Sequence, residues 1–279
     1  MERRAFLRAA AVALLSAGWA PRALAAIAAG SAPTVQGLNL AEYLQRMREF
    51  DQPHAGDVIL EGARVQLMRK TLARLRRLYR TIGDGKYHLL DFNTALKEAD
   101  DWGLRVGDFA RDEINFLEEI FYADATKYGF LGEKPLRNIT DQIPPDEVVK
   151  VPGSGNYLYR GRPFETFVKL QKDLGDGVVL TSGVRGVMKQ FLLFFEKANS
   201  ANGNLSLASR SLAPPGFSFH GISDFDVGQK GFGKNNFTER FVTTPVFDQL
   251  CRLDYVDLRY PRDNLLGVRF EPWHIKVKA

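Results

Sequence analysis

The spacing of apolar residues predicts helices in the first half of the chain. Across residues 38–130, apolar side chains recur at steps of three and four, which places them on one face of a helix. One such stripe runs through Val65, Met68, Leu72, Leu75 and Tyr79. A second helix is expected to start near residue 109, with Ile114, Leu117, Ile120 and Phe121 on its apolar face.

The pattern changes after residue 130. Residues 131–157 hold four prolines and little periodicity, which is typical of a connecting segment. Beyond it, short apolar runs of strand type alternate with helical stretches. Strands are expected at 177–181 and 225–227, with a strand pair within 267–278, and helices at 164–172, 187–198 and 237–253, the last interrupted by Pro245.

This mixed order predicts an α+β fold. No regular βαβ units appear, so we expect a small antiparallel sheet with flanking helices, preceded by a helical N-terminal region. The chain of 279 residues is then divided into residues 1–25, a helical region of unknown role at 38–150, and a domain at 151–279. The lone Cys251 excludes an internal disulfide, and its surroundings predict a buried helical face.

Residues 1–25 have the features of an export signal. A charged start is followed by a short apolar run and by small residues at 23–25. Arg3 and Arg4, followed by Phe6 and Leu7, resemble a twin-arginine signal, which predicts a periplasmic protein; an ordinary secretory signal is the alternative. The apolar run is too short for a membrane anchor, so no stable membrane insertion is expected once the signal is removed.

The net charge does not indicate a nucleic-acid partner. The whole chain carries +5. Four arginines and one glutamate in residues 1–25 contribute +3 of this, which leaves about +2 for the rest. Seven Lys and Arg residues flank the apolar stripe at 64–80. They fit either a surface for an anionic polymer or lipid headgroup or a solvated helix face, and we favour the solvated face.

Two short strings near the C-terminus carry the candidate chemistry. The first, residues 218–226, contains His220 and two aspartates, and the second is Glu-Pro-Trp-His at 271–274. Two imidazoles and a carboxylate leave one position open at a zinc ion, and a spare glutamate beside them suits a general base. His54 and His88 lack such company and are interpreted as ordinary surface or core histidines.

Two carboxylates compete for the role of metal ligand. Asp224 and Asp226 are two residues apart, so in a strand both point to the same face. Asp226 is the preferred ligand, with Asp224 as the alternative. Arg185 follows the strand at 177–181, where a guanidinium can reach a developing oxyanion or a substrate carboxylate.

The ordered set Ser-Gly-Val-Arg (182–185), Ser-x-His…Asp (218–226) and Glu-x-Trp-His (271–274) resembles the zinc D-alanyl-D-alanine carboxypeptidases of the VanY/VanX type, grouped with lysostaphin-type enzymes and the hedgehog signalling domain. The resemblance covers about residues 158–279. His220 and Asp226 are six residues apart, whereas the family's His and Asp are seven apart. The resemblance implies that His220, Asp226 and His274 hold one zinc ion per chain. It also implies that Glu271 is the base, that Arg185 steadies the oxyanion, and that Ser218 helps to bind the substrate carboxylate.

The function that this resemblance implies is hydrolysis of D-Ala-D-Ala bonds in peptidoglycan stem peptides. The alternatives are an L,D-carboxypeptidase or a cross-link endopeptidase of the same fold. A zinc-stabilised cell-wall-binding domain without catalysis is a further alternative, and Glu271 argues against it because a binding module needs no base beside the metal.

Overall fold

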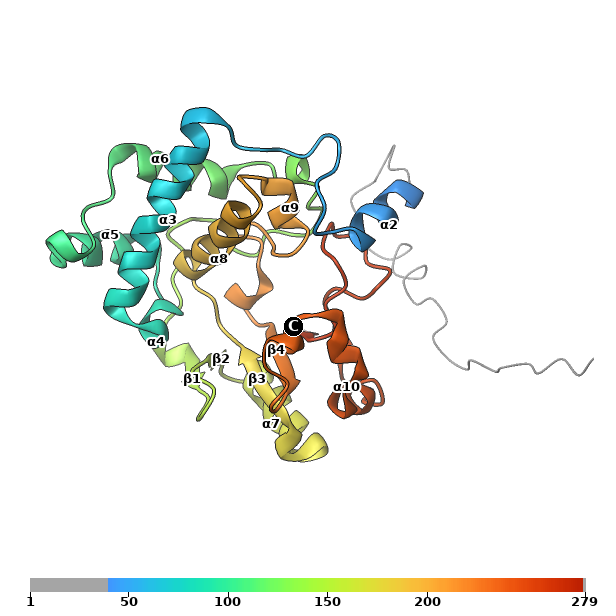
Figure 1. Cartoon of the computed structure of the whole chain (residues 1–279). Helices are drawn as coiled ribbons and strands as arrows, with labels where there is room; N and C mark the ends of the chain where they lie inside the picture. The colour runs from blue at the N-terminus through green and yellow to red at the C-terminus, as the bar shows by residue number, and fades with distance from the viewer. Residues whose placement is uncertain (1–39, 278–279) are drawn as a thin grey trace, which may run out of the picture. The chain divides into compact units, whose positions relative to one another are not determined.

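The computed structural model describes residues 40–277. The signal-like residues 1–25 lie outside this part of the chain. Figure 1 shows α3 (Gly62–Ile82) beside α8 (Val187–Ser200), with strands of a small sheet below them in the view. The predicted α+β class is confirmed: helices precede and flank a four-stranded antiparallel sheet.

Helices dominate the first part of the chain. They are α2 (Leu40–Arg48), α3 (Gly62–Ile82), α4 (Asp84–Tyr87), α5 (Phe92–Asp101) and α6 (Arg111–Tyr122). The buried face of α3 carries Met68, Leu72, Leu75 and Leu78. Val65 and Tyr79 are partly buried and pack against the same core, which confirms the predicted stripe and adds Leu78 to it. Helix α6 starts two residues after the expected position.

The basic residues of α3 form ion pairs with the helices beside it. Arg74 lies 2.9 Å from the fully buried carboxylate of Glu113 on α6. Arg64 and Lys70 also pair with acidic residues of α6, and Arg76 pairs with Glu196 of α8. Arg64, Lys70 and Arg76 still expose 38–48 % of their side chains, so the solvated-face prediction holds for them. It is wrong for Arg74, which is 11 % exposed because α6 packs against it.

The second part alternates helices and strands. The helices are α7 (Arg162–Leu174), α8 (Val187–Ser200), α9 (Leu205–Ser209) and α10 (Pro245–Leu250). The largely helical stretch expected at 237–253 consists of short pieces: two 3₁₀ segments, Gly233–Phe237 and Glu239–Thr243, precede the short α10. Pro245 begins α10 instead of interrupting it, because the first helical turn needs no amide hydrogen from proline.

The sheet has the strand order β3–β4–β6–β5. Its strands are β3 (Val178–Ser182), β4 (Phe225–Gln229), β6 (His274–Lys276) and β5 (Asp257–Leu258), and each neighbouring pair is antiparallel. The strand pair expected within 267–278 is a single strand, β6, which pairs with β4 and β5 instead. Residues 131–157, expected as a connection, also contain β1 (Val148–Lys150), which forms a hairpin with the following β2 (Tyr157–Tyr159).

The core of the protein has two main hydrophobic clusters. One cluster is built by α3, α5, α6 and α8 and includes Leu75 and Phe195, both fully buried. The other lies under the sheet and is built by α7, α10 and the strands, with Phe225 and Ile275 facing each other across β4 and β6. The predicted boundary near residue 150 lies between α6 and α7 in the sequence. Helix α3, before this boundary, and helix α8, after it, nevertheless share one hydrophobic core.

Two further expectations concern the surface. Cys251 is exposed just after α10, so the buried position expected for it is wrong. Val246 and Leu250 of α10 turn inward instead, and Cys251 follows the last helical residue on the outer side. No helix within residues 40–277 combines the length and apolar character needed to cross a bilayer.

Candidate metal centre and active site

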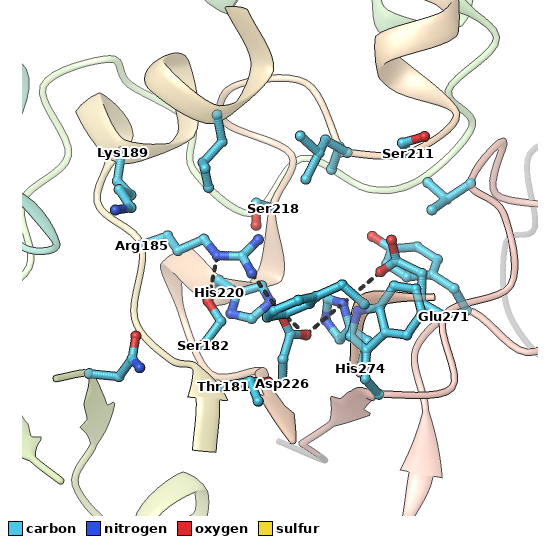
Figure 2. Close-up of a pocket in the computed structure, with 18 of the residues that line it drawn as sticks. Thr181, Ser182, Arg185, Lys189, Ser211, Ser218, His220, Asp226, Glu271 and His274 are labelled. Atoms are coloured by element: carbon cyan, nitrogen blue, oxygen red, sulfur yellow. Dashed lines mark hydrogen bonds and ion pairs between the residues drawn. The ribbon is translucent and has the colours of Figure 1, made fainter. Parts of the chain in front are cut away.

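The pairing of β4 with β6 brings two candidate ligands side by side. Asp226 lies directly opposite His274 in the antiparallel register, and Ser182 lies opposite Asp226 on β3. Residues directly opposite each other in such a sheet point to the same face. Phe225 and Ile275 turn to the other face and into the core. The strand alternation that buries Phe225 therefore also aims Asp226 at the cavity (Figure 2).

His220 reaches Asp226 from a separate 3₁₀ turn, Phe219–Gly221. Its Nδ1 lies 2.7 Å from the carbonyl oxygen of Gly183, an arrangement in which the ring nitrogen donates its hydrogen. Nε2 of the neutral ring then carries a lone pair. Nε2 lies 3.2 Å from Oδ1 of Asp226, and neither of these two buried atoms has a hydrogen-bond partner.

Two hydrogen-bond acceptors that face each other in a buried site are unfavourable unless a cation lies between them. Protonation of His220 does not supply this cation near neutral pH, because burial and the charge of Arg185 lower the pKa of His220 to about 4. The carboxyl group of Asp226 stays ionised: burial raises its pKa, but His220 and Arg185 outweigh burial and hold it well below the usual value. A divalent cation would satisfy both atoms.

His274 completes the group from β6. Its Nδ1 lies 3.6 Å from Oδ1 of Asp226 and 3.2 Å from Oε2 of Glu271. Burial lowers the pKa of His274, but hydrogen bonds to Asp224 and Glu271 outweigh burial and raise the pKa to about 9. The carboxylates around the His274 ring thus favour a positive charge next to the two atoms without hydrogen-bond partners, Nε2 of His220 and Oδ1 of Asp226.

The donor set fits zinc. One ligand atom from each of His220, Asp226 and His274 lies within 4.8 Å of the others. Zinc binds nitrogen and oxygen at about 2.1 Å, so tetrahedral ligand atoms are about 3.4 Å apart. The separations of 3.2 and 3.6 Å from Asp226 to the two imidazoles lie around this value. These three side chains could hold the ion and leave its fourth position free.

Asp224 performs a different task. Both of its oxygens accept hydrogen bonds from Arg259, at 2.6 and 2.9 Å, and Oδ1 also accepts from the backbone of Val277. Oδ2 lies 3.2 Å from Nε2 of His274, the ring nitrogen that faces away from Asp226. A carboxylate on this far nitrogen fixes the orientation of a ligating imidazole and its protonation. The geometry therefore places Asp224 behind His274.

Arg185 lies against the candidate ligands. It follows β3 in the loop that leads to α8, and its Nη2 donates to Oδ2 of Asp226 at 2.6 Å. Nε donates to the hydroxyl of Ser182 at 2.9 Å, and the backbone amide donates to the carbonyl of His220. The guanidinium therefore borders both the cavity and the ligand group (Figure 2).

Glu271 and Ser218 line the same cavity, which has a volume of about 570 Å³. The side chain of Glu271 is 9 % exposed, and its carboxylate contacts His274 from the cavity side. Ser218 immediately precedes the turn that carries His220, and it is also buried. The six residues singled out from the sequence thus all border one cavity, although they come from three separate stretches of the chain.

Sequence reasoning missed two residues of this site. Arg259 holds Asp224, and the buried Tyr260 packs its ring edge-on against His274, with ring centres 5.1 Å apart. Burial and the nearby Glu271 raise the pKa of Tyr260 far above its usual value, so it remains a neutral phenol. Both residues follow the two-residue strand β5, whose sequence is too short to give a recognisable strand pattern.

Comparisons with known proteins point to one family. Residues 161–278 match the family model VanY, D-alanyl-D-alanine carboxypeptidase. The chain is also similar to a zinc-bound structure of the D,D-pentapeptidase VanY, at 22% identity and TM-score 0.38 over 47% of this chain and 78% of that one. It is similar to the LD-carboxypeptidase LdcB, at 21% identity and TM-score 0.38 over 48% and 69% of the two chains.

A further similar structure is the D,D-dipeptidase VanXYg bound to a D-Ala-D-Ala phosphinate analogue, at 18% identity and TM-score 0.42 over 53% of this chain and 58% of that one. No curated protein sequence matches the chain. The family match covers every candidate residue, from Arg185 to His274. Residues 161–278 thus match a VanY-type carboxypeptidase domain, and the zinc-compatible donor set lies within this match.

Proposed function

We propose that the protein is a D,D-carboxypeptidase that removes the terminal D-Ala from stem peptides ending in D-Ala-D-Ala. The observation that carries this proposal is the placement of Glu271 beside a zinc-compatible group. Its carboxylate lies 3.2 Å from Nδ1 of His274, within a cavity that also holds Arg185 and Ser218. The match to the D-alanyl-D-alanine carboxypeptidase family supports the same bond.

His220, Asp226 and His274 are the proposed metal ligands. Their zinc ion would polarise the scissile carbonyl and lower the pKa of a water molecule toward about 7. Glu271 takes the proton from the attacking water and returns it to the leaving amine. Its carboxylate lies 3.2 Å from Nδ1 of His274 and borders the cavity, where a metal-bound water would lie.

Arg185 and Ser218 are proposed to act on the substrate. The guanidinium of Arg185 stabilises negative charge as it develops on the carbonyl oxygen, and the hydroxyl of Ser218 binds the substrate carboxylate. In the structure Arg185 is 14 % exposed and bonded to Asp226. It therefore borders the reacting group while it is already held in place, which lowers the cost of organising the site.

We propose that the helical residues before 150 support the loop that carries Arg185. His88, which follows α4, is buried, and its Nδ1 contacts the carbonyl of Val184 at 3.2 Å. The carbonyl of His88 accepts a hydrogen bond from Gly186 at 2.7 Å. His88 thus forms hydrogen bonds with Val184 and Gly186, the two neighbours of Arg185 in the sequence. These bonds connect the N-terminal helical region directly to the loop that carries Arg185.

The proposed compartment is the periplasm, reached through a twin-arginine signal in residues 1–25. The charged start and the Arg3–Arg4 pair support it. The test is fractionation of cells that express a tagged full-length chain. Replacement of both arginines by lysine should strand the precursor in the cytoplasm, whereas normal export of this double variant would indicate the general secretory route.

The scissile bond is tested with defined peptides. The zinc-loaded full-length protein is incubated with a pentapeptide ending in D-Ala-D-Ala, with the corresponding tetrapeptide, and with a cross-linked dimer, and the products are weighed by mass spectrometry. The proposal predicts loss of one alanine from the pentapeptide. Cleavage of the tetrapeptide alone would indicate an L,D-carboxypeptidase, and cleavage of the dimer alone would indicate an endopeptidase.

A further inference from the structure

The active-site cavity extends well beyond the metal group along helix α8. Lys189, Leu193 and Lys197 line it at intervals of four residues, so they form one stripe on a single face of the helix. At 1.5 Å per residue the stripe is about 12 Å long. A terminal dipeptide spans about 7 Å when extended. The cavity therefore has room for residues of the peptide beyond the D-Ala-D-Ala end.

The two lysines at the ends of this stripe differ in whether a carboxylate pairs with them. Lys189 lies 3.0 Å from Asp84, which neutralises it. Lys197 lies at the other end, where Arg269 also lines the cavity. Within residues 40–277, neither Lys197 nor Arg269 has a carboxylate at ion-pair distance, so acidic residues act on these two cations only at longer range.

Arg269 is held rigidly at the cavity wall. Its guanidinium carbon lies 4.5 Å from the ring centre of Phe50 and 4.8 Å from that of Trp273, so two aromatic rings pack against it. Nη2 donates to the carbonyl of Phe237, while the buried Nε has no hydrogen-bond partner. A pre-ordered guanidinium with a spare donor is well suited to bind a carboxylate.

The electrostatics of Lys197 agree with an unfilled anion site. Burial lowers the pKa of Lys197, the charge of Arg269 lowers it further, and the charge of Asp51 opposes both effects. Burial also lowers the pKa of Arg269, against the opposing charges of Glu271, Glu239 and Asp51. A bound carboxylate would relieve the repulsion between the two cations.

We propose that Lys197 and Arg269 form a subsite for a second, internal carboxylate of the substrate, so that the enzyme prefers stem peptides with free internal carboxylates over amidated ones. This inference rests on the proposed function, because it assumes that a stem peptide occupies the cavity with its terminal residues at the metal group. The substrate class is an anionic peptide with a carboxylate on a residue before the D-Ala-D-Ala end.

Binding is measured without turnover in the zinc-loaded full-length Glu271→Gln protein, by calorimetric titration with three pentapeptides. One has all its carboxylates free, one has its internal carboxylates amidated, and one has only its C-terminal carboxylate amidated. Charge-assisted hydrogen bonds predict that the free peptide binds about 10-fold or more tightly than the internally amidated one. The preference should fall to near unity when Lys197→Met and Arg269→Met are added together.

Matched variants make the result specific. Lys197→Met alone, which removes a partly exposed side chain, should lower the preference at least threefold even if the double change disturbs folding. Lys189→Met is the control, because it removes a compensated cation of the same stripe and should leave the preference unchanged. An unchanged preference in both Lys197 variants overturns the inference. The inference is also overturned if a Lys197 variant no longer binds the free peptide more tightly than the peptide with an amidated C-terminus. Lys197 would then contact the terminal carboxylate and not an internal one.

Hydrolysis by the wild-type protein separates the two proposals. If it removes D-Ala from free and internally amidated peptides with equal kcat/KM, and both peptides bind equally, the subsite is wrong while the carboxypeptidase stands. If it cleaves neither peptide but the Lys197-dependent preference in binding remains, the subsite stands and the proposed cleavage is wrong. Absence of binding by all three peptides overturns the subsite.

Discussion

Arg185 donates a hydrogen bond to Oδ2 of Asp226 at 2.6 Å, and the other oxygen of that carboxylate has no hydrogen-bond partner. The bond holds the Asp226 carboxylate so that Oδ1 faces the two imidazoles of the site. One guanidinium thus orients a candidate metal ligand and also borders the cavity in which substrate would lie.

Replacement of this guanidinium should affect turnover more than metal content. We expect Arg185→Ala to slow D-Ala release by roughly 10²–10³-fold, the scale for a lost oxyanion donor. Zinc content should stay near one per chain because all three ligands remain. Turnover is followed by D-Ala release and zinc by atomic absorption. Lys189→Ala, which removes another cavity cation, is the control, and an equal loss in both variants would show that general cavity charge, not Arg185, matters.

Replacement of Asp226, which lies in β4, and replacement of Asp224, which precedes β4, should have different effects on zinc content and stability. Asp226→Ala deletes an oxygen that faces both imidazoles and should lose most of the bound zinc. Asp224→Ala should retain more zinc but unfold more easily, since it leaves Arg259 buried without its partner, a defect that costs about 3–5 kcal/mol. Zinc analysis and thermal denaturation of both variants test this. Greater zinc loss in Asp224→Ala would move the ligand assignment to that residue.

A buried ion pair that does not involve the candidate metal ligands predicts a pH dependence of stability. Asp57 lies 2.7 Å from Arg210, and both side chains are at most 4 % exposed. Burial raises the pKa of Asp57, but hydrogen bonds from Arg210 and Asn204 outweigh burial and lower the pKa from 3.8 to about 2. The stabilisation is therefore complete above about pH 4 and is lost as the pH falls through 2.

Asp57→Asn removes this dependence. Urea denaturation should show a large difference in unfolding free energy between wild type and Asp57→Asn at pH 6. Between pH 4 and pH 2 the difference should narrow by about 2 kcal/mol, because only the wild type loses an ionised carboxylate there. A difference that stays constant over this range would mean that the pair does not stabilise the fold in its charged form.

The contact of His88 with the Arg185 loop predicts an effect on catalysis from outside the cavity centre. His88→Ala should lower kcat by several-fold to about tenfold with KM and zinc content little changed, because the loop loses a hydrogen bond near Arg185. Stopped-time assays over a range of peptide concentrations give kcat and KM. His54→Ala is the matched control, since the imidazole of His54 contacts the backbone carbonyl of Glu49 and does not line the cavity. Equal behaviour of the two variants would refute a positioning role for His88.

Most residues of the candidate site could be predicted from the sequence, but most of their supporting contacts could not. Asp226 and His274 could be placed on strands because alternation with Phe225 and Ile275 is visible in the sequence, and their pairing follows from an antiparallel sheet. The roles of Asp224 and Arg259 could not be predicted, because the two residues meet across a gap of 35 residues. Likewise, the burial of Arg74 against Glu113 could not be predicted, since nothing in its own helix shows that α6 packs beside it.

The central claim is that Glu271 is the base of a zinc-dependent D,D-carboxypeptidase. The most direct measurement compares D-Ala release from a D-Ala-D-Ala-ended pentapeptide by zinc-loaded wild-type protein and by zinc-loaded Glu271→Gln, which keeps the side-chain shape but cannot accept the proton. We predict that both proteins hold about one zinc per chain and that the variant is slower by roughly 10²-fold or more. Equal rates in the two proteins, or no D-Ala release by the wild type from any stem peptide, would contradict the account.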